Sequence, residues 1–145
     1  MTDRYTDDIK EIENTIEALF SAICWSPDKA PDWERFAGLC LDDVVLVPAA
    51  RPAKTTALKP FIATMSKQRD EGGLLNFHER VFAHDVGVFG NVAVARSSFA
   101  TSINKATETR GVNAFMLVKS DGAWHIAAMS WDNESEAHPV PADLE

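Results

Sequence analysis

The start of the chain carries hydrophobic residues at helical spacing. They recur three or four positions apart and form one stripe: Ile9, Ile12, Ile16, Leu19, Phe20 and Ile23. Thr6 precedes the stripe as a suitable N-cap, and Asp7 and Asp8 would interact favourably with the positive end of a helix dipole. Pro27 ends the helix soon after Trp25. The pattern therefore predicts an amphipathic helix that buries one face.

Two more helices and a short strand are predicted next. Residues 31–40 predict a short helix whose apolar stripe is Trp33, Phe36, Ala37 and Cys40. Residues 44–47 predict a strand, which ends before Pro48. Residues 57–69 predict a third helix, for which Thr56 is a suitable N-cap.

The second half of the chain has the pattern of strands. They are predicted over residues 75–84 with a continuation over 86–89, then over 92–102, 110–119 and 123–131. The dipeptide Asp121-Gly122 separates the last two, and this pair between apolar flanks is a strong hairpin signal. Helices that precede an antiparallel sheet predict an α+β fold.

Length and charge narrow the possible functions. At 145 residues we expect one domain over 1–132, followed by a loosely held acidic tail over 133–145. The formal net charge of -8 disfavours binding to nucleic acids and to anionic membranes. No apolar run approaches the roughly 18 residues of a membrane span. Residues 1–8 are polar and acidic, unlike a signal peptide, so we expect a cytoplasmic protein.

The sequence predicts no metal site and no cofactor. Cys24 and Cys40 lack the spacing of metal or redox motifs, so we expect reduced core residues. The four histidines also lack metal-ligand spacing. Among them, His84 falls near a predicted strand end and is expected to be exposed.

Four sequence features together resemble the nuclear transport factor 2-like superfamily. They are the amphipathic first helix followed by Trp25 and Trp33, then Phe77-x-Glu79, then the turn Phe89-Gly90-Asn91-Val92-Ala93, and finally Arg110-Gly111-x-Asn113 leading to Asp121-Gly122-x-Trp124-x-Ile126. The likeness extends to the SnoaL-like polyketide cyclases, ketosteroid isomerase and scytalone dehydratase. It implies a cone-shaped, curved antiparallel sheet wrapped around three N-terminal helices, which is a cystatin-like α+β barrel. It also implies an apolar pocket inside the cone and a homodimer packed through the sheets.

Alternation along the last strand divides its side chains between two faces. The resemblance places the face of Trp124 and Ile126 toward the helices, so Ala128 and Ser130 would lie nearer the pocket. With a two-residue Asp121-Gly122 turn, Asn113 lies opposite Ser130 on that inner face. A three-residue turn with a glycine bulge would instead place Asn113 on the other face.

The other face of the last strand is apolar as well. It comprises His125, Ala127, Met129 and Trp131. Either the tail or a second subunit must cover such a surface, and we expect a homodimer packed through it.

Glu79 is the candidate catalytic residue. If Phe77 and Val81 point into the cone, Glu79 does as well, and a carboxylate in an apolar pocket can serve as a general base. The alternative is a structural ion pair with Arg96 or Arg110.

Further side chains are candidates for lining the pocket. Ser97 and Phe99 share one face with two alanines, and Ser97 could donate a hydrogen bond. Arg51 lies in a loop that can approach the pocket mouth, where it could bind an anionic group or remain solvated. Trp33 and Phe61 are expected in the core first and in the lining second. The predicted ligand-binding set is Trp33, Arg51, Phe61, Ser97, Phe99, Asn113 and Ser130.

Three functions remain open on the sequence alone. The first is a binding protein for a small hydrophobic molecule. The second is a lyase, isomerase or cyclase with Glu79 as base and Asn113 or Ser130 orienting a carbonyl. The third is a non-catalytic dimerisation or interaction module. The tyrosine that the resemblance implies for ketosteroid isomerase and scytalone dehydratase is missing, since Tyr5 lies outside the predicted core.

Overall fold

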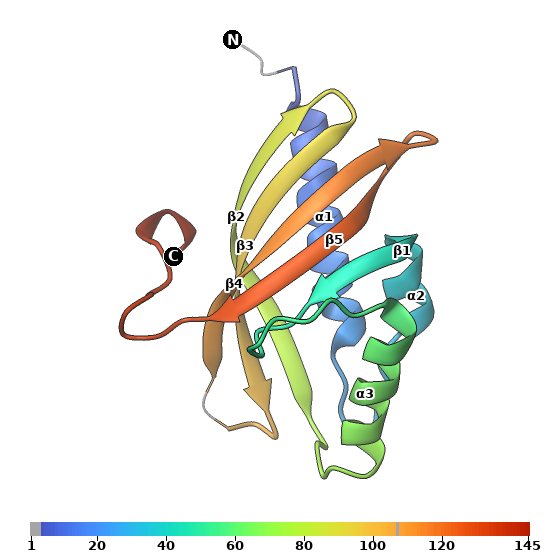
Figure 1. Cartoon of the computed structure of the whole chain (residues 1–145), viewed down its shortest axis with the longest axis vertical. Helices are drawn as coiled ribbons and strands as arrows, with labels where there is room; N and C mark the ends of the chain where they lie inside the picture. The colour runs from blue at the N-terminus through green and yellow to red at the C-terminus, as the bar shows by residue number, and fades with distance from the viewer. Residues whose placement is uncertain (1–3, 107) are drawn as a thin grey trace.

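The computed structural model describes residues 4–106 and 108–145 and shows the α+β order that the sequence predicts. The elements, shown in Figure 1, are α1 (Thr6–Ile23), α2 (Trp33–Gly38), β1 (Cys40–Val47), α3 (Leu58–Asp70), β2 (Phe77–Phe89), β3 (Val92–Ile103), β4 (Thr109–Ser120), β5 (Ala123–Asn133) and the 3-10 helix η1 (Ala142–Leu144). Residues 1–3, on which the expectation about the N-terminus partly rests, lie outside the described residues. Within the described residues, no helix is both long and apolar enough to cross a membrane.

One curved, five-stranded sheet forms the frame of the molecule. Its strand order is β1-β5-β4-β3-β2, with β2 to β5 antiparallel and β1 parallel to β5. In Figure 1 the long strands bend across α1, which lies behind them. The predicted stripe of α1 is the face that becomes buried, against the inner residues Ala93, Ala95, Phe115, Leu117, Trp124 and Ile126. This arrangement is the expected cone.

A β-bulge at Ala127 decides which side chains of β5 enter the cone. Ser120 pairs with Ala123 across a two-residue turn, in which Asp121 and Gly122 have positive φ. The pairing then shifts, because Leu117 lies opposite Ile126 but Met116 lies opposite Ala128. Beyond the bulge the two faces are exchanged. Met129 and Trp131 therefore point inward, and Ala128 and Ser130 point outward.

This exchange corrects two expectations from strict alternation. Ser130 is not on the pocket side, and Met129 and Trp131 do not belong to the outer face. Of the two positions left open for Asn113, the structure shows the inner one, but Asn113 lies opposite Trp131 and not opposite Ser130.

A second bulge, at Phe82, turns His84 toward α1. Val81 pairs with Phe99 while Ala83 pairs with Ser98, so the alternation along β2 also shifts by one residue. The expectation that His84 is exposed is wrong, since its side chain is only 10% exposed.

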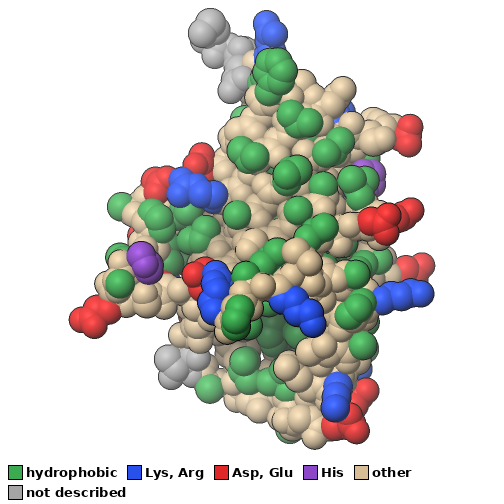
Figure 2. All heavy atoms as spheres, viewed as in Figure 1, with side chains coloured by type: hydrophobic (Ala, Val, Ile, Leu, Met, Phe, Trp, Pro, Cys, Tyr) green, Lys and Arg blue, Asp and Glu red, His purple; other side chains and the backbone are tan. Residues whose placement is uncertain are grey.

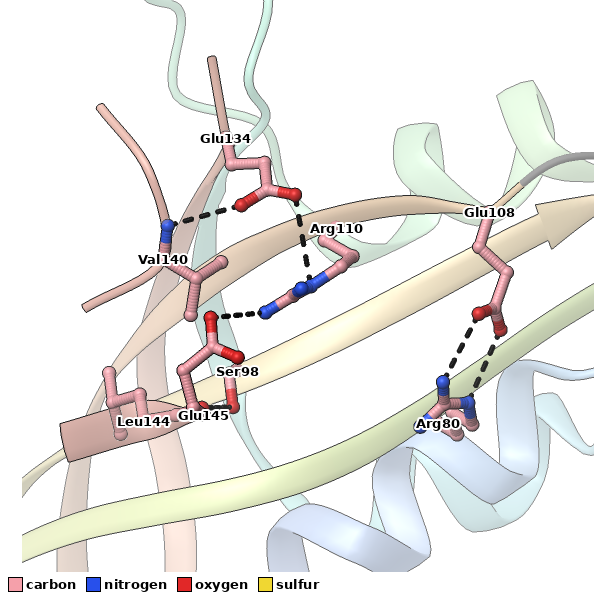
Figure 3. A network of polar contacts seen from close by, with 8 residues as sticks. All are labelled: Arg80, Ser98, Glu108, Arg110, Glu134, Val140, Leu144 and Glu145. Atoms are coloured by element: carbon pink, nitrogen blue, oxygen red, sulfur yellow. Dashed lines mark hydrogen bonds and ion pairs between the residues drawn. The ribbon is translucent and has the colours of Figure 1, made fainter. Parts of the chain in front are cut away.

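The C-terminal tail is folded against the outer face of the sheet, which corrects the expectation that it is loosely held. In Figure 1 it leaves β5 and turns back at the left of the view. Val140 and Leu144 are buried, and the Ser98 hydroxyl donates a hydrogen bond of 2.6 Å to the backbone oxygen of Leu144. Arg110 binds Glu145 at 2.8 Å and lies 3.7 Å from Glu134 (Figure 3).

Candidate functional site

A small cavity lies inside the cone between α1 and the sheet. Its volume is about 40 Å³, which is room for one or two water molecules. Apolar side chains make most of its wall: Leu19, Phe20, Ile23, Phe36, Phe61, Phe99, Met129 and Trp131. Glu79 and Asn113 are the polar members of the lining. An apolar wall with a few convergent polar groups is the usual composition of a ligand site.

β2 holds Glu79 at this cavity through contacts of its backbone with α1. The Glu79 amide donates to Cys24 Sγ at 3.3 Å, and the thiol donates to the Glu79 carbonyl oxygen at 3.4 Å. Burial raises the pKa of Glu79 to about 7 from its ordinary value of 4.5. A hydrogen bond from the side chain of Thr101, its cross-strand neighbour, opposes this rise in pKa.

Neither arginine proposed as a partner for Glu79 is near it. Arg96 binds Asp85 at 2.7 Å and Asp143 at 2.9 Å on the outer face of the sheet. Arg110 is also on the outer face, where it binds the tail. Among residues 4–106 and 108–145, no ion pair involves Glu79. The alternative of a structural ion pair with Arg96 or Arg110 is therefore wrong.

Asn113 presents an unsatisfied acceptor to the cavity. The residue is 6% exposed, and its Oδ1 atom has no hydrogen-bond partner within the part of the chain that the structure describes. A buried polar atom without a partner costs about 1–3 kcal/mol. A donor that enters the cavity would remove this cost, so the amide is suited to bind a hydroxyl or an N–H group.

Four aromatic rings contact one another around Phe61 of α3, and three of them, Phe36, Phe61 and Trp131, line the cavity. Phe61 of α3 stacks on Phe36 with ring centroids 6.2 Å apart, and it meets Trp131 edge-on at 6.0 Å. Trp33 contacts Phe61 edge-on at 6.1 Å and Phe36 at 5.4 Å. Phe61 thus joins α3 to both α2 and β5.

Phe99 also lines the cavity, next to Phe20 at 6.1 Å. Its ring lies close to Gly111. A Cβ atom at that position would be 2.8 Å from the ring and would also collide with the Asp132 carbonyl oxygen. The glycine in the Arg110-Gly111-x-Asn113 motif therefore permits a close approach of ring and backbone.

Four predicted lining residues are not part of the cavity lining. Trp33 contacts the lining rings of Phe36 and Phe61 but does not itself line the cavity. Ser130 faces outward and donates a hydrogen bond to the Val47 carbonyl oxygen at 3.1 Å. Arg51 binds the carbonyl oxygens of its own loop and lies 3.5 Å from Asp132. Ser97 is fully buried outside the cavity lining.

Sequence reasoning missed a buried polar row beneath α1. His84 Nδ1 lies 2.8 Å from the Ser97 hydroxyl, and His84 Nε2 lies 3.5 Å from Glu17 of α1. The three residue types match those of a serine hydrolase, but Ser97 has no exposed surface that a substrate could reach. The row joins α1 to the sheet. Strict alternation along β2 does not predict this row, because only the bulge at Phe82 places His84 on the inner face.

The described residues contain no group of three metal-ligating side chains. Cys24 and Cys40 are free thiols, and burial raises the pKa of Cys40 to about 12. A thiol with such a pKa stays protonated at neutral pH and is a poor metal ligand.

No protein family model and no curated protein matches the chain, but solved structures do. A nuclear transport factor 2-like protein of unknown function from Pseudomonas putida KT2440 is 16% identical, with a TM-score of 0.70 over 97% of each chain. A provisionally assigned scytalone dehydratase from Novosphingobium aromaticivorans is 16% identical, with a TM-score of 0.70 over 93% of this chain and 89% of that one. A provisionally assigned aromatic ring hydroxylase from the same species is 12% identical, with a TM-score of 0.69 over 89% and 90%. The chain therefore has the fold of the nuclear transport factor 2-like superfamily.

Proposed function

We propose that this protein binds a small hydrophobic molecule inside the cone. The proposal rests on one observation. Glu79 and the unpartnered Oδ1 of Asn113 belong to the same, otherwise apolar, cavity lining. A core that served packing alone would gain nothing from a buried Asn113 without a partner, since an unpaired polar group costs free energy when buried. The names of two similar structures, a dehydratase and an aromatic ring hydroxylase, fit a ligand of this class.

The cavity is smaller than an ordinary ligand pocket. About 40 Å³ is far below the roughly 300–1,000 Å³ of ordinary ligand pockets, so lining side chains must move when a ligand binds. A nearly filled cone is what the interaction module predicts. The two polar groups in the cavity lining are what that module does not explain.

Thermal unfolding with a panel of small apolar alcohols, ketones and phenols tests the binding proposal. A ligand that binds only the folded protein raises the melting temperature with increasing concentration. The variant Asn113→Leu has a similar volume but no acceptor, so it should lose the response. A panel without any response in the wild-type protein would leave the interaction module as the better function.

The state of Glu79 favours catalysis as a second candidate function. A carboxyl group with a pKa of about 7 and no arginine partner is half deprotonated at neutral pH, which suits a general base. The side-chain N–H group of Asn113 could then donate to the carbonyl oxygen of a substrate and orient it. Lyases, isomerases and cyclases that remove a proton next to a carbonyl group use such a base.

Proton exchange in deuterated water tests this second function without a known substrate. We expect the wild-type protein to accelerate deuterium incorporation beside the carbonyl group of small cyclic ketones, as followed by NMR. Glu79→Gln keeps the shape but removes the base, so the acceleration should vanish. Equal rates for the two proteins would mean that Glu79 is not a base for these compounds.

The homodimer also remains a proposal, with a corrected surface. Met129 and Trp131 point inward, so the contact face is formed by other residues: Val45, Val92, Val94 and Met116, which are 40–66% exposed. Figure 2 shows hydrophobic side chains spread over this side of the molecule. Such a face can pair with its own copy across a two-fold axis. Sedimentation should show a dimer for the wild type and a monomer for Met116→Glu.

The cytoplasmic location stays a prediction.

A further inference from the structure

Phe61 occupies a space that is otherwise framed by aromatic rings. Phe36 faces it at an interplanar angle of 24°, while Trp33 and Trp131 meet it at 88° and 76°. One stacked and two edge-on neighbours form the arrangement that aromatic rings prefer. The position is therefore suited to a flat aromatic ring more than to an aliphatic group of the same size.

The helix that carries Phe61 is the most weakly anchored helix of the cone wall. α3 contains no buried residue, and Leu58, Phe61 and Met65 reach the core only in part. Figure 1 shows α3 beside α2 at the end of the sheet, outside the curve of the long strands. The other lining rings, such as Phe20 and Phe99, are 4% exposed and belong to the core. Phe61 is thus the lining ring that a ligand could displace at the lowest cost.

Asn113 belongs to the same cavity lining as Phe61. It is the cross-strand neighbour of Trp131, which also lines the cavity. A ring that replaces Phe61 would therefore share one small cavity with the unpartnered Oδ1 atom. That atom can only accept, so a ring substituent that binds it has to be a donor.

We propose that the ligand is a planar aromatic molecule with a hydroxyl or amine group, that its ring replaces the Phe61 ring, and that its donor binds Asn113 Oδ1. This proposal rests on the proposed binding function and names its ligand class. Phe61 then acts as a built-in plug that fills the aromatic position while no ligand is bound.

Three probes of similar size separate the parts of this proposal. Phenol has a ring and a donor, toluene has a ring without a donor, and cyclohexanol has a donor without an aromatic ring. Their dissociation constants are measured by NMR titration with the wild type, Phe61→Ala and the double variant Phe61→Ala with Asn113→Leu. We expect Phe61→Ala to bind phenol at least tenfold tighter than the wild type, and at least tenfold tighter than it binds toluene or cyclohexanol. In the double variant the preference for phenol over toluene should disappear while toluene still binds.

A matched control separates this position from any cavity left by a lost phenylalanine. Phe77 stacks on Trp25 at 4.9 Å and does not line the cavity. Phe77→Ala should therefore bind phenol no better than toluene. If Phe61→Ala is poorly folded, Phe61→Leu replaces it, because leucine keeps the helix apolar but lacks the ring.

Two results would overturn the proposal in different ways. Phenol binding that depends on Asn113 but is equal in the wild type and in Phe61→Ala would place the ligand elsewhere in the cone and leave the binding function intact. Failure of all three probes to bind either protein would contradict the binding function itself.

Discussion

Asn113 lies directly opposite Trp131 in the sheet, although the two-residue turn at Asp121-Gly122 would by itself pair it with Ser130. The single extra residue at Ala127 causes the difference. It moves Met129 and Trp131 into the cone and places Trp131 against Phe61. The lining of the candidate site therefore depends on one bulge.

Deleting Ala127 should remove this bulge. Ala128 would then follow Ile126 in regular alternation, so Met129 and Trp131 stay inward while the bend that the bulge gives to β5 is lost. We expect a loss of about 1–3 kcal/mol in the free energy of unfolding. Urea denaturation measures the loss. Ala127→Ser keeps the residue count and should stay within about 1 kcal/mol of the wild type. A deletion variant as stable as the wild type would show that β5 does not need the bulge to curve around α1.

Glu79 should make the protein less stable as the pH rises. Its pKa is about 7 in the folded state and near 4.5 when unfolded, so the folded state binds more protons between these values. Stability is then highest below pH 4.5 and falls until about pH 7, by up to about 3 kcal/mol. Glu79→Gln cannot ionise and should be more stable than the wild type at pH 8 but not at pH 5. Urea denaturation at both pH values measures this, and a difference that does not change with pH would contradict it.

Leu144 should contribute more to tail docking than the acidic side chains do. Leu144 is fully buried, so Leu144→Ala should lower the free energy of unfolding by about 2–4 kcal/mol. The ion pair of Asp143 with Arg96 is exposed to solvent, so Asp143→Ala should cost less than about 1 kcal/mol. Thermal unfolding compares the two variants at low and high salt. A larger effect of Asp143→Ala would mean that charge, and not apolar burial, holds the tail.

Ser97 should be inert to reagents that label catalytic serines. It is fully buried, and its hydroxyl is engaged with His84. We expect no mass increase after treatment with a sulfonyl fluoride, whereas labelling of Ser97 would indicate a hydrolase site. Ser97→Ala should destabilise the protein by about 1–2 kcal/mol, because His84 loses its hydrogen-bond partner.

Local patterns were sufficient for the elements and the fold class. The stripe of α1 from Ile12 to Ile23 is buried as predicted, because helical periodicity and burial follow from neighbouring residues. The Asp121-Gly122 turn has the two positive φ angles that hairpins need. The face of Asn113 stayed open on the sequence, because it depends on the register of the hairpin, which the turn alone does not fix.

Other features depend on residues that are far apart in the chain. Trp124 Nε1 donates to Asp8 at 3.0 Å, and Ser98 binds the backbone of Leu144, which no local pattern reveals. No local pattern predicts that the tail is held, because its partners Arg96 and Arg110 lie on β3 and β4, far from it in the sequence. The bulges at Phe82 and Ala127 arise where a curved sheet closes around α1, and a single inserted residue exchanges two faces without changing composition or periodicity. The sequence by itself determined the helices, the strands and their turn, whereas the tertiary structure decided which side chains face the cavity, because register and curvature are set by packing between distant segments.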